Sequence, residues 1–387
     1  MEKVVIYNPL GNSKGHSKIY ASGIVNGFLK REIDTILITS ADFDSSFLET
    51  DNIKIEKTKK VTNKNINTST KINKLNYGFF LLENTLTSFK RIKKYNNNKN
   101  IILIIGGDTL FNTILLLFTV NKKNIGLTIH NSDYELSIYK NDPIKFIYKA
   151  LSKIFIKLLT FSGIKIFCHG KYTAKVLEQQ LRAKPGRIKN YLVPIVEKKQ
   201  LTRREKTSEF NLLFFGIIRY DKGLDILIKA LNFFEGKRFK LYVCGSTSQM
   251  GEEKVKKILL RSNRYDRIIT DFGYLEEDKL EYYFSKATYV VLPYRKTFRA
   301  QSVVFTDSLK RHVPVISSIE SQNGFDTSFY KVGETFESEN IKSLTHAINA
   351  AYSKWERKNL PDTKNFKKYL KSCSPVEISK QISNAFF

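Results

Sequence analysis

Cysteine and histidine are scarce in this chain of 387 residues, and their scarcity excludes several kinds of site. The three cysteines, Cys168, Cys244 and Cys373, share no motif spacing and are odd in number. We therefore expect buried free thiols in a reducing compartment, not a disulfide framework. The five histidines are scattered and form no ligand pattern, so we predict that the protein holds no metal.

Acidic residues are also few, 37 against 65 Lys and Arg, which gives a net charge of +28. A field of this sign favours anionic partners: nucleic acid, acidic membrane surfaces or phosphorylated substrates. Lys, Asn and Ile are abundant throughout, so compositional drift explains part of the excess equally well. A long uninterrupted apolar run is missing too. The nearest candidate, residues 101–120, contains Gly106, Gly107 and Asp108, and it fits a buried strand, a turn and a helix better than a membrane span. The chain runs straight into the apolar segment VVIY, so we expect no signal peptide.

Short apolar segments alternate with longer helical patterns along the whole chain. They predict strands at 4–7, 35–40, 53–56, 101–106, 125–130, 164–170, 211–216, 240–245, 267–273, 288–294 and 313–318. Continuous rather than alternating apolar residues are typical of parallel sheets buried on both faces. The sequence therefore predicts an α/β protein of two Rossmann-like, doubly wound domains facing a cleft, 1–195 and 205–365, joined by a polar linker at about 195–209.

The segment NLLFFGIIRYDKGLDILIKAL (211–231) contains the strongest local pattern. It reads as a strand, a loop and an amphipathic helix. Gly216 allows the backbone to turn sharply after the strand. Arg219 and Lys222 then lie near a helix N-terminus, where two cations favour a pyrophosphate. The alternative is a pair of solvated cations on an ordinary surface loop.

This run resembles the donor-phosphate motif of the retaining family-four glycosyltransferases, which have the GT-B fold. The resemblance implies that Arg219 and Lys222 neutralise the diphosphate of a nucleotide sugar and act in catalysis. It implies no metal and no other cofactor, because the two cations can stabilise the leaving group. It also implies that residues 366–387 form a helical segment that packs back toward the first domain.

A second match to this family lies at PYRKTFRAQSVVFTDSLKRHVPVISS (293–318). The family usually has two glutamates eight residues apart before Pro-Val-Ile. The second acidic position falls on Asp307, which the resemblance makes the ligand of the donor ribose. The first falls on Arg299, a departure that leaves open a chain which binds a donor without transferring it. Gln301 and Ser302 are similar to a Gln-Ser turn in some branches, so we assign these two and Arg299 to donor binding.

The first domain matches the family more loosely. Gly11 and Gly15 lie in a loop after the first strand, where the fold places the donor, although simple loop flexibility explains them equally well. The loop is not GxGxxG, so a nicotinamide cofactor is unsupported. His130 ends a strand and resembles a family histidine that touches the donor sugar, so the resemblance makes it a candidate catalytic residue. The alternative is a structural histidine, which is the commoner role at a strand end. His169 ends another strand, and a structural role is the simpler interpretation of it.

Residues 143–161, PIKFIYKALSKIFIKLLTF, predict a helix with lysines at every fourth position from Lys145 to Lys157. A basic stripe beside a wide apolar face suits a helix lying on an anionic membrane surface. A core helix whose wet side is basic fits equally well.

Together with these patterns, the resemblance implies a glycosyltransferase that moves a sugar from a nucleotide diphosphate sugar to a carbohydrate or lipid-linked carbohydrate acceptor, with retention. We expect a role in bacterial-type surface polysaccharide synthesis, in the cytoplasm or peripherally on the inner face of the cell membrane. The rival from another class is a basic nucleic-acid-binding protein. We do not expect nucleic acid as a partner, because the cations are dispersed and no recognition motif is present.

Overall fold

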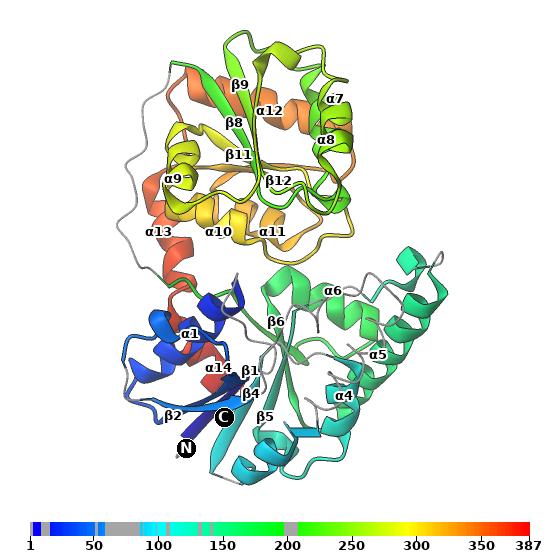
Figure 1. The fold of residues 1–387 in the computed structure, drawn as a ribbon, viewed down its shortest axis with the longest axis vertical. Helices are drawn as coiled ribbons and strands as arrows, with labels where there is room; N and C mark the ends of the chain where they lie inside the picture. Colours follow the sequence, from blue (N-terminus) through cyan, green and yellow to red (C-terminus); the bar gives the residue numbers. More distant parts are fainter. Residues whose placement is uncertain are drawn as a thin grey trace. The chain divides into compact units, whose positions relative to one another are not determined.

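The computed structural model describes residues 3–8, 16–50, 53–58, 86–87, 89–97, 99–105, 109–130, 134–139, 142–196 and 208–387. The chain divides into two compact units (Figure 1). The first contains residues 1–198 and 372–387, and the second contains residues 199–371. Each unit is built on a parallel sheet flanked by helices, so the predicted α/β fold class with two Rossmann-like sheets is confirmed.

The sheet of the first unit has the strand order β3-β2-β1-β4-β5-β6-β7. The strands are β1 (Lys3–Asn8), β2 (Thr35–Ser40), β3 (Lys54–Thr58), β4 (Asn100–Ile104), β5 (Ile125–Ile129), β6 (Lys165–His169) and β7 (Ile188–Tyr191). The connecting elements are α1 (His16–Leu29), η1 (Ser45–Phe47), α4 (Leu110–Leu117), η2 (Lys122–Asn124), η3 (Leu136–Tyr139), α5 (Pro143–Phe161) and α6 (Lys171–Leu181).

Alternate residues of the first-unit strands enter two separate cores. Val4 and Ile6 of β1 pack with α1 and with the C-terminal helix α14 (Pro375–Asn384), which lies against α1. Val5 and Tyr7 of the same strand pack on the other face, under α4, α5 and α6. Because both faces are buried, the strands need apolar residues at nearly every position, which explains the continuous apolar runs in the sequence.

The sheet of the second unit has the strand order β10-β9-β8-β11-β12-β13. The strands are β8 (Phe210–Phe215), β9 (Phe239–Gly245), β10 (Ile268–Phe272), β11 (Tyr289–Leu292), β12 (Val315–Ser318) and β13 (Gly333–Phe336). The helices are η4 (Tyr220–Lys222), α7 (Leu224–Leu231), α8 (Glu252–Leu259), η5 (Tyr265–Arg267), α9 (Glu277–Lys286), α10 (Val303–Lys310), α11 (Gln322–Tyr330), α12 (Ile341–Glu356) and α13 (Thr363–Ser372).

Two strands were not predicted, β7 and β13. Each has only four residues, IKNY and GETF, and each is the last strand at one edge of its sheet. Their sequences carry no apolar run, because an edge strand is covered less completely than a central one. Backbone pairing with β6 and β12 places them in the sheets.

Three features of single elements bear on the sequence predictions. Cys168, Cys244 and Cys373 are free and buried, as predicted. None of the helices in the described residues combines the length and the hydropathy needed to cross a bilayer. The predicted basic stripe of α5 is wrong for Lys149, which is only 8% exposed and lies with its Nζ 5.1 Å from the centre of the Tyr134 ring. Lys153 and Lys157 are half-buried, and the Lys145 side chain falls outside the described part.

Candidate functional site

The loops after β8 and β11 meet where the strand order of the second sheet reverses. From this central pair the chain runs outward to β10 on one side and to β13 on the other. In open α/β sheets, ligands bind outside the carboxyl ends of the strands at such a reversal. The first of these loops contains the predicted Gly216, Arg219 and Lys222, and the second contains Arg299, Gln301 and Ser302.

Glycine is required at both ends of the loop that follows β8. Gly216 has φ +116° and Gly223 has φ +67°, conformations that other residues rarely adopt. A Cβ on Gly223 would lie 1.9 Å from the carbonyl oxygen of Pro293, so the two loops touch directly. A Cβ on Gly216 would lie 3.4 Å from Val304 in the first turn of α10. The loop with the two predicted cations therefore lies against the start of α10.

Arg219 is held by its near neighbour Asp221 in a bidentate ion pair. The Nε and Nη2 atoms donate to the two carboxylate oxygens at 3.0 and 2.8 Å. Both side chains keep about a third of their surface exposed, so the pair is open to solvent. A planar guanidinium fits phosphate in the same two-pronged way as carboxylate. Arg219 is therefore oriented and ready to exchange Asp221 for an anion.

Lys222 points its amine at two aromatic rings that the sequence analysis did not single out. Its Nζ lies 3.7 Å from the centre of the Tyr294 ring and 3.9 Å from that of Phe298. Burial, with a smaller contribution from the Arg219 cation, lowers the pKa of Lys222 from 10.5 to about 7. The amine is thus close to half-protonated at neutral pH, and an anion bound beside it would restore the full charge.

Arg295 positions the loop that carries these cations, and the sequence analysis missed it. Its Nη2 donates to both carboxylate oxygens of Asp225 at 2.7 Å, and its Nη1 donates to Glu339 at 2.9 Å. Its Nε donates to the carbonyl oxygen of Tyr220, the first residue of η4, at 3.0 Å. Arg295 is itself buried, whereas Asp225 and Glu339 keep 27% and 41% of their side-chain surface exposed. The residue fastens the β11 loop to η4 and to the first turn of α7.

Ser302 connects the aromatic rings to the start of α10. Its hydroxyl lies 3.1 Å from the hydroxyl of Tyr294, and its backbone N–H donates to the Asn323 side chain at 2.8 Å. Arg299 lies on the same loop, where its Nε donates to the carbonyl oxygen of Lys296 at 3.0 Å. Ser302 and Lys222 therefore both contact Tyr294, Ser302 at its hydroxyl and Lys222 at its ring.

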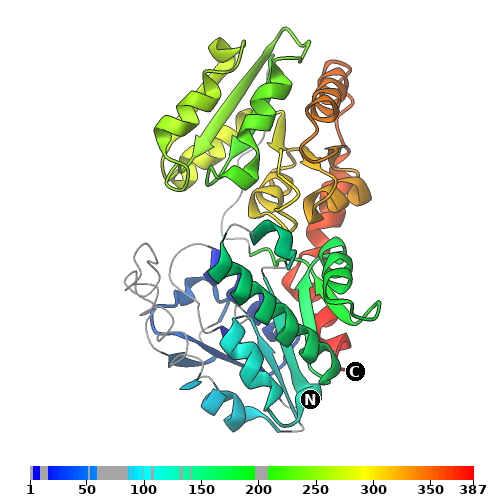
Figure 2. The same ribbon diagram turned by 90° about the vertical axis from the view of Figure 1, so that its right-hand side faces the viewer.

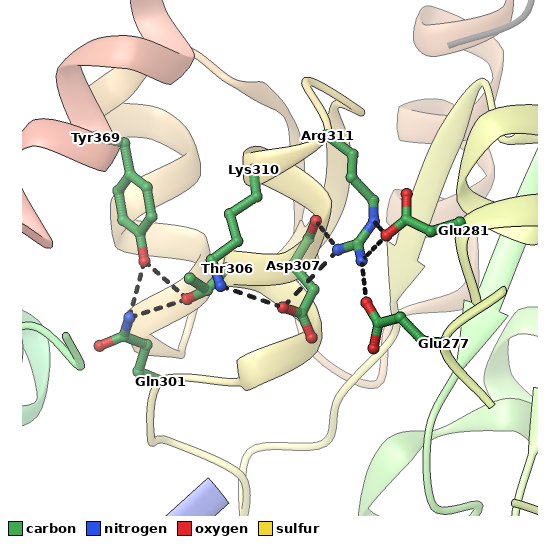
Figure 3. Close-up of polar contacts among 8 residues, drawn as sticks. All are labelled: Glu277, Glu281, Gln301, Thr306, Asp307, Lys310, Arg311 and Tyr369. Atoms are coloured by element: carbon green, nitrogen blue, oxygen red, sulfur yellow. Dashed lines mark hydrogen bonds and ion pairs between the residues drawn. The ribbon is translucent and has the colours of Figure 1, made fainter. Parts of the chain in front are cut away.

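Gln301 and Asp307 lie on different sides of α10 (Figure 3). The Gln301 amide is buried and donates to Tyr369 at 2.8 Å and to Thr306 at 3.2 Å. The Asp307 carboxylate faces Lys310 and Arg311, 3.9 Å from a nitrogen of each. Asp307 keeps some exposure, whereas Gln301 is turned into the interior of the unit.

Arg311 anchors the Asp307 side of α10. Its Nε donates to Glu281 at 2.9 Å, its Nη2 lies 3.6 Å from Glu277, and its Nη1 donates to the Asp307 carbonyl at 3.0 Å (Figure 3). Because Arg311 is engaged chiefly by Glu281, it leaves the Asp307 carboxylate only loosely paired.

His130 and His169 meet in the first unit, at the carboxyl ends of β5 and β6. Their ring centres are 4.9 Å apart, and the Tyr20 ring lies 4.9 and 5.1 Å from them. Tyr20 and Tyr191 share a hydrogen bond of 2.5 Å between their hydroxyls. Burial, and then the neighbouring His130, hold the pKa of His169 well below its ordinary value. His169 is therefore neutral at pH 7, inside a neutral aromatic cluster.

The remaining predicted site residues, Gly11 and Gly15, lie outside the described residues. Within the described ranges, no group of three or more His, Cys, Asp and Glu side chains is arranged to hold a metal ion.

Comparison with known proteins relates this geometry to a family. Residues 197–371 match the family described as glycosyl transferases group 1. Curated proteins give no significant match.

Among solved structures, sucrose-phosphate synthase from Thermosynechococcus elongatus is similar, with a TM-score of 0.69 at 14% identity, over 100% of this chain and 98% of that chain. Anabaena HepE in complex with UDP and glucose has a TM-score of 0.65 at 13% identity, over 99% of both chains. WaaG, a glycosyltransferase involved in lipopolysaccharide biosynthesis, has a TM-score of 0.62 at 12% identity, over 99% of both chains. The second unit therefore contains a domain of the glycosyl transferases group 1 family, and the chain as a whole has the two-domain GT-B fold of these solved structures.

Proposed function

We propose that this glycosyltransferase takes a sugar from a nucleotide diphosphate sugar and gives it to a carbohydrate or lipid-linked carbohydrate acceptor. The observation that carries the proposal is the placement of Arg219 and Lys222 on one glycine-bounded loop at the strand reversal of the second unit. A diphosphate is the anion for which a bidentate guanidinium and a nearby amine are suited. HepE, which was solved with UDP, supports this class of donor.

The chemistry that we assign to these residues is electrostatic. As the bond between the sugar and the diphosphate breaks, negative charge grows on the departing phosphate oxygens. Arg219 exchanges Asp221 for this phosphate, and Lys222 becomes fully protonated beside it. Both cations act where charge develops, so they lower the barrier more than they tighten donor binding. Arg295 does not contact the donor in this scheme; it holds the loop in position.

We further propose transfer with retention, in which the acceptor hydroxyl attacks on the face that the diphosphate leaves. The resemblance of residues 211–231 and 293–318 to the retaining family supports this stereochemistry. Asp307 is our candidate ligand of the donor ribose, since a carboxylate accepts hydrogen bonds from two hydroxyls. The proposed setting is surface polysaccharide synthesis, and the similarity to WaaG, a glycosyltransferase involved in lipopolysaccharide biosynthesis, supports it.

A thermal-shift panel tests the donor class. The protein is melted with UDP, GDP and ADP and with the matching monophosphates UMP, GMP and AMP, and then with the sugar nucleotides of whichever base binds. We expect the nucleoside diphosphate of one base to raise the Tm, and the monophosphate of the same base to leave it unchanged. Transfer to candidate acceptors is then followed by NMR, and retention predicts that the anomeric configuration of the donor is kept. Stabilisation by none of the diphosphates would overturn the proposal, and an inverted product would overturn its stereochemistry.

The departure at Arg299 supports a second candidate, a chain that binds a donor without transferring its sugar. The two differ in one measurement. Slow hydrolysis of the bound sugar nucleotide, with release of free sugar, requires a working leaving-group site. Donor binding with no release of sugar over long incubation would favour the second candidate.

A further inference from the structure

Helix α5 departs from the usual pattern of a helix packed on a sheet, in which the large apolar side chains are buried and the polar ones are exposed. Its buried positions include polar side chains, Lys149, Ser152 and Thr160, beside Ile156 and Leu159. Its opposite side, here called the outer face, exposes Ile144, Ile147, Leu151, Ile154, Leu158 and Phe161, and Phe146 and Tyr148 are exposed along its flanks. An isolated exposed leucine needs no explanation, but a continuous apolar row along a helix of 19 residues marks a contact surface.

The outer face lies on the open side of the first unit, where α5 faces the viewer in Figure 2. The turn after α4 adds to it. The backbone N–H of Leu110, at the start of α4, donates to the Tyr148 hydroxyl at 3.4 Å, and Lys123 lies beside Gly163 at the far end of α5. Phe118 and Val120, in the stretch between these contacts, are 75% and 63% exposed. The apolar surface is therefore wider than one helix.

Cations border this surface, and acids are nearly absent from its segment of the chain. Residues 143–194 contain eleven Lys and Arg against a single acid, Glu178. Five of these cations are exposed on α6 and the residues after it: Lys171, Lys175, Arg182, Lys184 and Lys189. Just beyond the end of α5, burial and then the cations Arg187, Lys189 and Lys123 lower the pKa of Lys165, so these cations lie close together.

We propose that the outer face of α5 docks the protein on an anionic lipid bilayer, with its apolar side chains inserted among the acyl chains. The charge pattern distinguishes this occupant from the others. Two copies of the chain would bring like cationic borders together, which opposes pairing through this face. An anionic bilayer satisfies both features at once: headgroups meet the cations, and the hydrocarbon boundary accepts the apolar row. The proposal does not depend on the donor or the reaction.

The structure changes which residues matter for docking. The sequence pattern pointed to the lysines of α5, but Lys149 is buried against Tyr134 and cannot reach a headgroup. Insertion depends on Ile147, Leu151 and Ile154, and attraction depends on the bordering cations of α6. Binding should therefore weaken with salt without vanishing, because salt screens the charges and leaves the apolar contact.

Vesicle flotation tests the proposal with a matched pair of triple variants. The first replaces Ile147, Leu151 and Ile154 with Gln. The second replaces Phe233, Leu260 and Tyr274 with Gln, three exposed apolar residues of the second unit. The probes are phosphatidylcholine vesicles with and without phosphatidylglycerol. We expect the parent and the second variant to float with the anionic vesicles. The bound fraction of the first variant should be at least tenfold smaller than that of the parent. All three proteins should keep the same Tm.

Insertion is tested by a tryptophan placed on the outer face. The chain has a single Trp, Trp355, which belongs to the second unit. Emission from an Ile154→Trp variant should shift to the blue, and should be quenched by doxyl-labelled lipid, only with anionic vesicles. Equal flotation of the two triple variants would overturn the proposal. So would an unshifted Ile154→Trp spectrum in bound protein, or light scattering that shows a dimeric parent and a monomeric first variant.

Discussion

The carboxyl edges of the two parallel sheets hold opposite kinds of chemistry. In the second unit this edge is charged: Arg219, Lys222 and the buried Arg295 lie on two touching loops. The described part of the corresponding edge in the first unit, here called the neutral edge, contains the uncharged His169, and the His130 and His169 rings pack edge-on against the Tyr20 ring. The described side chains at the two edges thus differ in charge. The variants below each change one side of this contrast.

The largest effect should come from removing the two cations of the charged edge. We expect Arg219→Ala and Lys222→Ala each to lower turnover by about 10²–10³-fold, the usual cost of losing one preorganised electrostatic group. The Tm should stay near the parental value, because both side chains are partly exposed. Donor hydrolysis or sugar transfer measures the effect.

Lys257→Ala is the matched control for these variants. Lys257 is an exposed cation on α8 in the same unit. Lys279 would serve less well, because it pairs with Asp271 at 3.2 Å. If both loop variants keep the parental turnover, the donor site lies elsewhere, and the proposed contrast between the two edges is wrong.

The second effect concerns the close contact between the two loops of the charged edge. Gly223→Ala adds a Cβ 1.9 Å from the Pro293 carbonyl oxygen, in a backbone conformation with φ +67°. Strain of this kind costs about 1–2 kcal/mol before any clash, so we expect more than about 2 kcal/mol of lost stability. Gly186→Ala, with φ +75° and no atom within 4 Å of the added Cβ, isolates the strain. Urea denaturation compares the two, and equal losses would show that the loops do not press on each other.

The third effect is a pH dependence of donor binding. The pKa of Lys222 is about 7 in the free protein and should rise when a diphosphate binds. Above pH 7 each bound donor must therefore take up a proton, and Kd should weaken by up to tenfold per pH unit. A sugar nucleotide is a suitable probe, since its diphosphate does not titrate there. Lys222→Arg should bind with an affinity independent of pH from 7 to 9, and a flat parental profile would contradict the assignment.

The smallest effect belongs to the neutral edge. The pKa of His169 lies below its value in the unfolded chain, so the unfolded state binds more protons as the pH falls through about 6.5. The parent should lose stability below that pH, by about 1 kcal/mol per unit, and His169→Phe should reduce the loss. His346→Gln, an exposed histidine of α12, is the control. Melting curves between pH 7 and 5 measure how stability depends on pH. If stability falls with pH as steeply in His169→Phe as in the parent, another group causes the loss.

The sequence by itself determined the fold class, most of the strands and the loop with Arg219 and Lys222. These follow from local rules: buried parallel strands need continuous apolar residues, and a chain that turns from strand to helix needs glycine at Gly216. The edge strands β7 and β13 were missed, because four residues without an apolar run carry too little local information.

Only the tertiary structure decided which groups meet. Tyr294 and Phe298 are more than 70 residues from Lys222, and Arg295 is 70 from Asp225, so no local spacing shows that these side chains share one site. The same holds for His130 and His169, which pairing of β5 with β6 brings together. For α5 the sequence showed an apolar helix with lysines but not its rotation. Both faces of the helix contain apolar residues. The face that packs on the sheet includes Lys149, Ser152 and Thr160, and the larger apolar side chains are exposed.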